Sequence, residues 1–334
     1  MKINIYKRIF LIIFVPLIFL FLTEFFLRVS IWNEKLGPQR FYGGLEDHSL
    51  FWNPNNIIRI PIDEYRLKNE FRGRKYSLKK LKGTIRIICL GGSFTYGWPY
   101  IHNPELSYPF VLEKLLNESK FLSSKYEVIN AGVGGYTSYQ GLFYFKYRLI
   151  KFNPDIVIVC FGANDSNNNL EIGSFLTDKE YYQRLLKLSK NKMLFRIYNF
   201  LNNLRIYALI EKIVFNIKKI FIRPKKRVPP SEFKSNLEEF IRLSKKYHFK
   251  LLLMLEPHRR LENFYQEVKN NLYCNIMYKL ALKNKEVILI DTISLVKKYR
   301  DDEIFCDIMH FNSFGYKILA RYIYDILLRK NLLR

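Results

Sequence analysis

Residues 85–97 read IRIICLGGSFTYG, an apolar run that leads directly into a glycine-rich turn holding Ser93. A short, near-continuous apolar run that ends at glycines predicts a strand buried on both faces. A turn from such a strand into a helix exposes a serine hydroxyl beside the free N–H groups of the helix start, where a nucleophile can work. The turn is also compatible with a phosphate-binding loop, but the lysine that a P-loop requires does not follow. Ser93 is therefore a candidate nucleophile.

Outward from this strand, the chain alternates apolar runs with stretches of helical period. Runs of strand length lie at 126–129, 155–161, 249–255 and 286–290, and helical stretches at about 107–119, 138–151, 233–247, 264–283 and 313–329. Apolar strands separated by helices predict a five-stranded parallel sheet covered by helices on both faces. Right-handed crossovers then gather the loops after the strands at one edge of the sheet, where such folds bind ligands.

Two of these loops carry groups suited to binding an anionic oxygen. After the second run comes NAGVGGYTS at 130–138, whose glycines let the backbone approach a ligand closely. After the third run comes GAND at 162–165, where the amide of Asn164 can donate a hydrogen bond to an oxyanion. Each segment, taken alone, is also compatible with a plain tight turn.

A fourth polar segment, DIMHFNSFG at 307–315, precedes the last helical stretch. Asp307 and His310 are spaced so that the carboxylate can bond one imidazole nitrogen and leave the other free to take a proton from Ser93. An isolated surface pair would show the same spacing. The spacing also suits metal ligation, but no further cluster of His or Cys supports a metal site, and we expect neither a metal nor a cofactor.

Taken together and in this order, the four segments resemble those of the SGNH/GDSL hydrolase family, over about residues 84–330 apart from much of 166–230. The resemblance implies a flavodoxin-like three-layer α/β/α domain and ester chemistry through a serine, histidine and aspartate triad. It assigns Ser93 as the nucleophile with Asp307 and His310, and an oxyanion hole made by the N–H groups of Ser93 and Gly135 (alternatively Gly134) and the amide of Asn164.

One position departs from the family pattern. The first family block reads GDS, whereas this chain has GGSF, with Gly92 in place of the aspartate. Glycine still permits the turn, and all the triad and oxyanion groups are present. The departure therefore weakens inference about the substrate, not the assignment of the nucleophile.

The composition excludes several classes of protein. The 334 residues carry a net charge of +25, and 49% of them are apolar. A disordered chain would lack this apolar content, and the four cysteines are too sparse for a disulfide-stapled mini-protein. We expect the cysteines to be structural free thiols, with a cross-strand disulfide between Cys89 and Cys160 as the lesser alternative. The positive charge is the only feature that favours a nucleic-acid partner. Because the sequence has neither zinc-finger spacing nor an RNA-binding aromatic motif, we do not expect such a partner.

The N-terminus reads as a membrane helix. The run from Ile9 to Leu27 is interrupted only by Thr23 and Glu24, and nineteen helical residues at ~1.5 Å each approach the ~30 Å thickness of the hydrocarbon. A cleaved signal peptide is the alternative, but the run is long for one and no small-residue cleavage site follows it. We favour an uncleaved single-pass anchor, with Glu24 and Arg28 placed to pair at its far end. Basic residues flank the run almost evenly, and the sequence only leans toward an extracytoplasmic catalytic domain.

The organisation predicted for the chain is an anchor at 1–29, a membrane-proximal linker at 30–83, and a hydrolase domain at 84–334 with an insertion at 166–230. Residues 184–227 hold thirteen basic side chains and one acid, Glu211. Two interpretations of this insertion remain open. It is either a packed helical cap with a solvated basic face, or an interfacial helix lying on an anionic membrane beside the anchor.

Three functions remain open at this stage. The leading one is a membrane-anchored serine esterase that removes an acyl group from a lipid or a cell-envelope glycan. The second is an O-acyltransferase that passes the acyl group from Ser93 to a sugar hydroxyl. The third is a non-catalytic, membrane-tethered binding module, which the intact set of Ser93, Asn164, Asp307 and His310 argues against.

Overall fold

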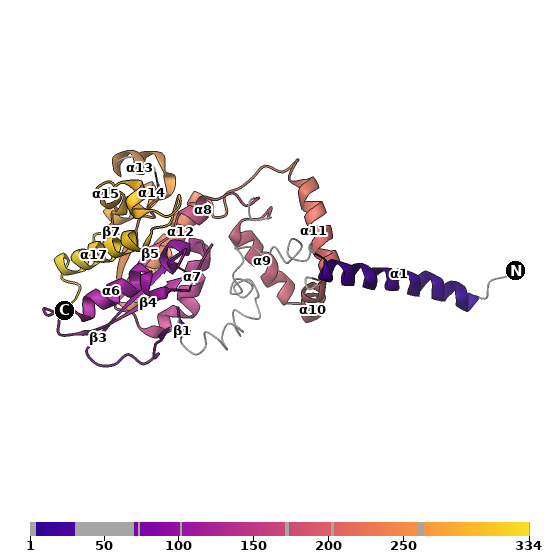
Figure 1. The fold of residues 1–334 in the computed structure, drawn as a ribbon, viewed down its shortest axis with the longest axis horizontal. Coiled ribbons are helices and arrows are strands. Elements are labelled where there is room, and N and C mark those ends of the chain that lie inside the picture. Colours follow the sequence, from indigo (N-terminus) through magenta and orange to yellow (C-terminus); the bar gives the residue numbers. More distant parts are fainter. Residues whose placement is uncertain are drawn as a thin grey trace.

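The computed structural model describes residues 5–30, 70–72, 74–100, 102–170, 174–201, 204–259 and 264–333. Most of the predicted linker at 30–83 lies outside these residues. Figure 1 shows a sheet flanked by helices, a group of helices (α9, α10 and α11) beside it, and the long helix α1 that extends away from both.

The five-stranded sheet is parallel throughout, as predicted. Its strands are β3 (Thr84–Gly91), β4 (Lys125–Gly132), β5 (Ile156–Cys160), β6 (Lys250–Met254) and β7 (Ile288–Ile290), in the order β4-β3-β5-β6-β7. This is the flavodoxin-like order, in which the first strand of the sheet, β3, lies between the second, β4, and the third, β5. The strand order reverses its direction at β3. The central strands β3 and β5 are buried on both faces because helices cover both sides of the sheet.

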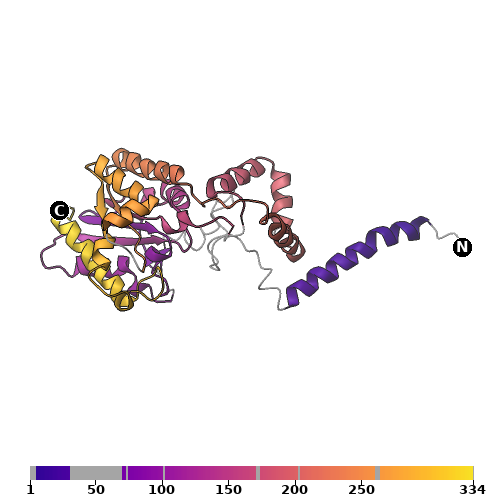
Figure 2. The ribbon, with the colours of Figure 1, turned by 90° about the horizontal axis from the view of Figure 1, so that it is seen from above.

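The helices form the two outer layers. Helix α6 (Tyr108–Asn117) packs against α17 (Ser313–Arg329), and α7 (Ser138–Tyr147) packs against α12 (Pro230–Tyr247), which also contacts α14 (Leu272–Lys283). Figure 2 shows α12, in orange, and α17, in yellow, on opposite sides of the sheet. The predicted three-layer α/β/α architecture is confirmed.

One predicted helix is wrong in detail. The stretch at 264–283 forms two helices, α13 (Phe264–Asn270) and α14, because the Asn271 side chain accepts the N–H groups of Tyr273 and Cys274 and starts a new helix there. The smaller elements are β1 (Glu70–Phe71), β2 (Arg74–Lys75), α5 (Ser93–Tyr96), η2 (Pro104–Leu106), η3 (Leu149–Phe152), α8 (Ala163–Ser166), α15 (Thr292–Val296) and α16 (Asp301–Ile304).

Helix α1 (Ile5–Val29) is long and apolar enough to cross a membrane, a test that a signal sequence near an N-terminus also passes. Large apolar side chains along it are exposed, among them Phe14 at 48% and Phe19 at 68%. At its end, Glu24 and Arg28 form the expected ion pair at 2.7 Å. The helix therefore presents apolar side chains to its surroundings instead of burying them in a protein core.

The segment after α8 holds α9 (Asp178–Ser189), α10 (Lys192–Leu201) and α11 (Arg205–Lys218). The two ends of this segment lie side by side, because the N–H of Asn169 bonds the carbonyl of Lys225, and the N–H of Arg227 bonds the carbonyl of Asn167. We call this paired region the neck of the insertion. It returns the chain to the sheet directly beside α8, which carries Asn164.

Candidate active site

The serine and histidine predicted from distant parts of the sequence lie in direct contact. Ser93 is the first residue of α5, immediately after β3, and its Oγ lies 2.7 Å from Nε2 of His310. The other imidazole nitrogen, Nδ1, lies 2.7 Å from Oδ2 of Asp307. The three side chains form one continuous line of hydrogen bonds, in the order that proton transfer from Ser93 to His310 requires.

The Asp307 carboxylate is held as an anion. Partial burial opposes its ionisation, but the N–H groups of Met309 and His310, at 2.8 and 2.7 Å, and the imidazole together keep the pKa of Asp307 below its ordinary value. The second oxygen remains free to orient His310. Asp307 is thus suited to hold the imidazole and to stabilise it when it becomes protonated.

Aromatic packing holds the histidine loop against the serine turn. Phe94, next to Ser93, and Phe311, next to His310, are both buried, with ring centroids 5.0 Å apart in an edge-on arrangement. The hydroxyl of Tyr316 donates to the carbonyl of Trp98 at 2.8 Å and ties the start of α17 to the segment after α5. Phe94 and Phe311, which adjoin Ser93 and His310 in the chain, are therefore fixed in the core.

Asn164 lies over the serine turn. A Cβ atom at Gly92 would stand only 2.8 Å from Nδ2 of Asn164, and this nitrogen donates to the carbonyl of Tyr136 at 3.0 Å. Glycine at position 92, where the family pattern has aspartate, thus leaves room for the amide. Asn164, the serine turn and the loop before Tyr136 meet at the carboxyl edge of the sheet, as predicted.

The loop after β4 presents the backbone of Gly135 at this edge. The N–H of Tyr136 bonds the carbonyl of Val133 at 3.1 Å and closes a tight turn, in which Gly135 has a φ of +75°. Positive φ at this position of a turn favours glycine. No described residue accepts the N–H of Gly135, and the N–H of Ser93, at the first position of α5, has no partner within its helix. Both remain available to a ligand oxygen.

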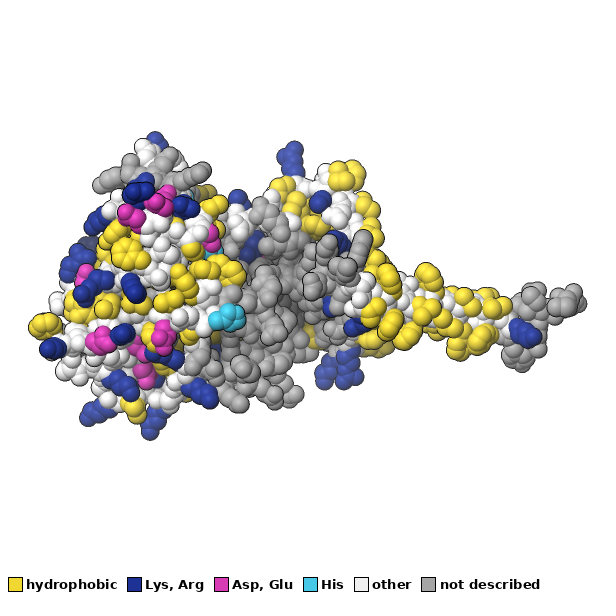
Figure 3. All heavy atoms as spheres, in the orientation of Figure 1, with side chains coloured by type: hydrophobic (Ala, Val, Ile, Leu, Met, Phe, Trp, Pro, Cys, Tyr) yellow, Lys and Arg dark blue, Asp and Glu magenta, His cyan; other side chains and the backbone are white. Residues whose placement is uncertain are grey.

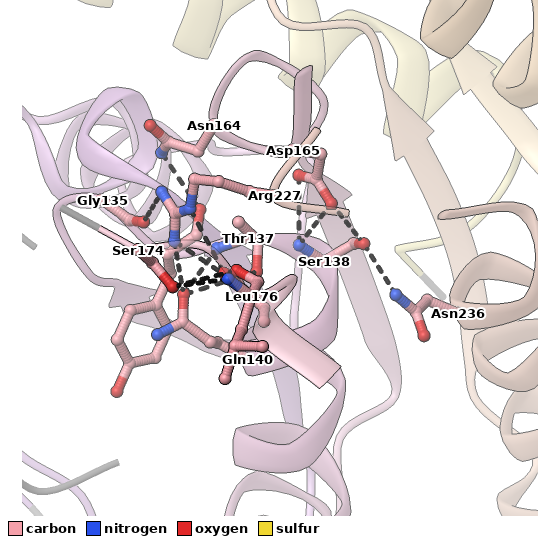
Figure 4. A network of polar contacts seen from close by, with 12 residues as sticks. Gly135, Thr137, Ser138, Gln140, Asn164, Asp165, Ser174, Leu176, Arg227 and Asn236 are labelled. Carbon is pink, nitrogen blue, oxygen red and sulfur yellow. Dashed lines mark hydrogen bonds and ion pairs between the residues drawn. The ribbon is translucent and has the colours of Figure 1, made fainter. Parts of the chain in front are cut away.

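The sequence analysis missed two residues that hold this loop in place. Arg227, which we counted only as part of the basic cluster, is buried and donates from Nη1 to the carbonyl of Gly135 at 2.9 Å. Asp178 is equally buried, 3.1 Å from Nη2 of Arg227, and accepts the hydroxyl of Thr137 at 2.7 Å. Figure 4 shows Arg227 reaching across this network to Gly135. Nothing in the sequence distinguishes Arg227 from its exposed basic neighbours.

A third unanticipated residue is Asp165, beside Asn164. It is fully buried and accepts the N–H of Ser138 at 3.0 Å and its hydroxyl at 2.5 Å, and Asn236 donates to the same hydroxyl at 2.9 Å (Figure 4). Burial raises the pKa of Asp165 to about 7, against the lowering effect of the bonds from Ser138. Asp165 thereby joins α8 to the start of α7. The sequence showed this aspartate in the segment GAND. It could not show the contact, because Ser138 and Asn236 lie far from Asp165 along the chain.

This raised pKa predicts a pH-dependent contribution to stability. Between the ordinary pKa near 4 and the folded value of about 7, the folded state binds more protons at Asp165 than the unfolded state, so stability falls as pH rises through this window. The slope reaches at most about 1.4 kcal/mol per pH unit. We expect Asp165→Asn to remove this pH dependence. The difference in unfolding free energy, wild type minus variant, should therefore fall between pH 5 and pH 8. Denaturant unfolding at several pH values measures this difference. A pH-independent difference would contradict the assignment.

No three His, Cys, Asp or Glu side chains within the described ranges come together in a way that could hold a metal ion. Cys89, Cys160 and Cys274 are buried free thiols, and burial raises the pKa of Cys89 and of Cys274 to about 12. Cys306 is exposed, and its pKa is also raised, first by desolvation and then by the charge of Asp307. These shifts favour the protonated thiol at neutral pH, which is the less nucleophilic form.

Comparison with known proteins gives one family match. The sequence model of the GDSL-like lipase/acylhydrolase family matches residues 89–318. No curated protein sequence matches the chain. Among solved structures, a lipase/acylhydrolase from Enterococcus faecalis is 18% identical, with a TM-score of 0.45, over 73% of this chain and 95% of that one. A GDSL-like lipase from Bacteroides thetaiotaomicron is 15% identical, with a TM-score of 0.44, over 76% of this chain and 93% of that one. Because these two structures are only 18% and 15% identical to the chain, the assignment to a family rests on the match to the sequence model alone.

Proposed function

Because the chain belongs to the GDSL-like lipase/acylhydrolase family, and is therefore a hydrolase acting on ester bonds, we propose that Ser93, His310 and Asp307 are its catalytic triad. The observation that carries the proposal is the line of hydrogen bonds from Ser93 Oγ through the imidazole to Asp307, with both distances at 2.7 Å. Ser93 and His310 are 217 residues apart in the sequence, and Asp307 and His310 are 3 apart. The fold brings all three side chains into contact.

The geometry supports hydrolysis in two steps. Ser93 Oγ attacks the ester carbonyl while Nε2 of His310 takes the hydroxyl proton, and Asp307 stabilises the resulting imidazolium. The imidazolium gives this proton to the departing alcohol, which leaves an acyl group on Ser93. A water molecule then attacks the acyl carbonyl, His310 takes its proton and returns it to Ser93 Oγ, and the carboxylic acid is released.

The negative oxygen that forms in both steps needs hydrogen-bond donors. We assign this role to the N–H groups of Ser93 and Gly135 and to the side-chain amide of Asn164. The first two are backbone donors without protein acceptors among the described residues, and the third lies against the serine turn. Donors that are fixed before the reaction stabilise the developing charge without reorganisation.

Labelling with a fluorophosphonate tests the triad directly. The reagent phosphonylates an activated serine, so full-length protein in membranes should be labelled at Ser93, and Ser93→Ala should not be labelled. His310→Ala should be labelled much more slowly, since the hydroxyl then lacks its base. Cys306→Ala, close to His310 but outside the hydrogen-bonded line, should label normally and serves as the control. Label on a different residue, or undiminished label on Ser93→Ala, would contradict the proposal.

Replacing Arg227 tests how the loop that carries Gly135 is positioned. Arg227→Leu breaks the buried ion pair with Asp178, and we expect a loss of about 3–5 kcal/mol in unfolding free energy. Adding Asp178→Asn removes the buried carboxylate charge and keeps an acceptor for Thr137, so stability should largely return. The value of kcat should stay low in the double variant, with KM little changed, because the carbonyl of Gly135 still lacks its donor.

Measured unfolding curves and steady-state kinetics on the same preparations separate the two effects. Recovery of kcat together with stability would assign Arg227 a structural role only, and the positioning role would be wrong.

We further propose that α1 is an uncleaved anchor and that the catalytic domain lies outside the cytoplasm, where it acts on a lipid or a cell-envelope glycan ester. The anchor is supported by the exposed apolar surface of α1 and by the two hydrogen bonds of Glu24 to the backbone of the insertion, at Arg205 and Ile206. A cleaved leader would leave those N–H groups without this acceptor. The side of the membrane and the substrate class rest on the sequence alone. Product analysis with and without a glycan acceptor tests whether water is the acyl acceptor.

A further inference from the structure

Helix α11 turns an apolar stripe toward solvent. Its exposed large side chains recur at intervals of three or four residues, which places them on one face of the helix: Ile210, Ile213, Val214, Ile217 and Phe221 just beyond its end. Their exposed fractions run from 40% at Val214 to 81% at Phe221. An amphipathic helix of a globular domain normally turns such a stripe toward the core, yet no residue of α11 is buried.

The preceding helix shows the same pattern. In α10 the exposed apolar residues are Met193, Leu194, Ile197 and Phe200, again at helical spacing. We call the exposed apolar residues of α10 and α11, with Ile220 and Phe221, the apolar face of the insertion. Exposed apolar side chains that line one face of each of two successive helices indicate an interaction site.

Basic side chains border this face. Residues 190–226 contain ten lysines and arginines and one acid, Glu211. Near the end of the stripe, Lys218, Lys219 and Arg223 are all exposed, while Lys225 pairs with Glu180. An apolar stripe bordered by exposed cations is the composition of helices that lie in the interface of an anionic bilayer.

The end of α1 is joined to the start of α11. The two oxygens of Glu24 accept the N–H groups of Arg205 and Ile206, each at 2.9 Å, and thereby satisfy two free donors of the first turn of α11. Arg28 pairs with the same carboxylate. From Lys7 to Glu24, seventeen residues of helix span about 25 Å, close to the thickness of a hydrocarbon layer. With Lys7 at one surface of a bilayer, Glu24 holds the start of α11 at the other.

The orientation of α11 fits this position. Figure 1 shows α11 running across the end of α1 instead of continuing along it. Figure 3 shows hydrophobic side chains gathered along the edge of α11 that faces the direction in which α1 projects. A bilayer crossed by α1 would meet this edge first.

We propose that α10 and α11 lie on the bilayer that α1 spans, with the apolar face among the upper acyl chains and the bordering lysines and arginines at anionic headgroups. The proposal rests on the proposed insertion of α1. A lipid surface is favoured over a protein partner because the first turn of α11 is joined to the end of α1 and because exposed cations lie beside the apolar face. The catalytic domain is then held at the membrane by two elements, the spanning helix and this surface.

Nitroxide labels in nanodiscs test the proposal. The labels are placed on full-length protein with Cys306→Ser, because the other three cysteines are buried. Two report on the stripe, Ile210→Cys and Ile217→Cys. The matched control is Asn216→Cys, exposed on the same helix but about 100° around it from Ile217. Leu17→Cys in α1 reports on the anchor.

The expected result is a several-fold higher ratio of oxygen to nickel-complex accessibility at Ile210 and Ile217 than at Asn216, approaching the ratio at Leu17. In anionic nanodiscs, Lys218→Glu with Lys219→Glu should lower the ratio at Ile217, and in zwitterionic nanodiscs it should not.

Three outcomes would overturn the proposal. If Leu17 lies in hydrocarbon while Ile210 and Ile217 are as accessible to nickel as Asn216, the insertion does not touch the membrane. If the two stripe labels are shielded from both reagents, protein covers the face instead of lipid. If Leu17 itself is in water, the anchor fails and this inference fails with it. None of these readouts depends on ester hydrolysis, so they leave the triad proposal to its own tests.

Discussion

We expect ester turnover to fall on the order of 10⁴- to 10⁶-fold when Ser93 or His310 is replaced by alanine, because either change removes the proposed covalent route through the acyl-enzyme. The measurement is kcat for an activated ester such as a nitrophenyl acetate, on full-length protein in detergent. Since the two residues act as one unit, the double variant should be no slower than either single variant. Residual activity above the uncatalysed rate is expected from the remaining oxyanion donors.

Two controls make this result interpretable. Unfolding curves of Ser93→Ala should match those of the wild type, because removing one half-buried hydroxyl leaves the packing of Phe94 against Phe311 intact. Cys306→Ala should retain its turnover. Wild-type kcat in either triad variant would show that another residue carries the chemistry.

Turnover falls on the order of 10²- to 10³-fold in Asn164→Ala, because one of three proposed oxyanion donors is lost, a change of about 3–4 kcal/mol in transition-state stabilisation. The loss should appear in kcat, with KM nearly unchanged, since the donor binds charge that exists only in the transition state. Asn167→Ala is the matched control, because it removes the same kind of side chain three residues further along the chain. A rise in KM alone would assign Asn164 to substrate binding.

Gly92→Ala tests the same donor, the amide of Asn164, by moving it instead of removing it. The new methyl group would stand 2.8 Å from Nδ2 of Asn164 and displace the amide from the serine turn. We expect a loss of kcat in this variant, and almost no further loss when it is combined with Asn164→Ala. Additive losses would mean that Gly92 affects Ser93 itself.

Much of the fold was predictable because it depends on local patterns. Each strand of the sheet is an apolar run of strand length, and parallel topology follows from the helices between them. The same topology explains why Ser93, Gly135 and Asn164 were expected at one edge, since each follows its own strand. In the loop after β4, Gly135 has a positive φ of 75°, and the choice between Gly135 and Gly134 as the oxyanion donor stays a prediction.

The positioning residues could not be predicted in the same way. Arg227 and Asp178 are 49 residues apart, and their contact depends on the neck of the insertion, where Arg227 pairs with Asn167 through the backbone. In the sequence, Arg227 is one of thirteen basic residues in 184–227, and only burial separates it from the rest. Asp165 presents the same difficulty, because its partner Ser138 lies in another helix.

The contact between Glu24 and the start of α11 also sets an order of events during synthesis. Its acceptor and donors are 181 and 182 residues apart, so at the usual pace of translation Glu24 emerges on the order of ten seconds or more before Arg205 and Ile206 exist. Under the proposed anchoring of α1, this helix enters the bilayer before α11 has been synthesised, and α11 then binds a carboxylate that is already in place. Folding of the insertion would then be completed at the membrane surface, after the anchor is inserted.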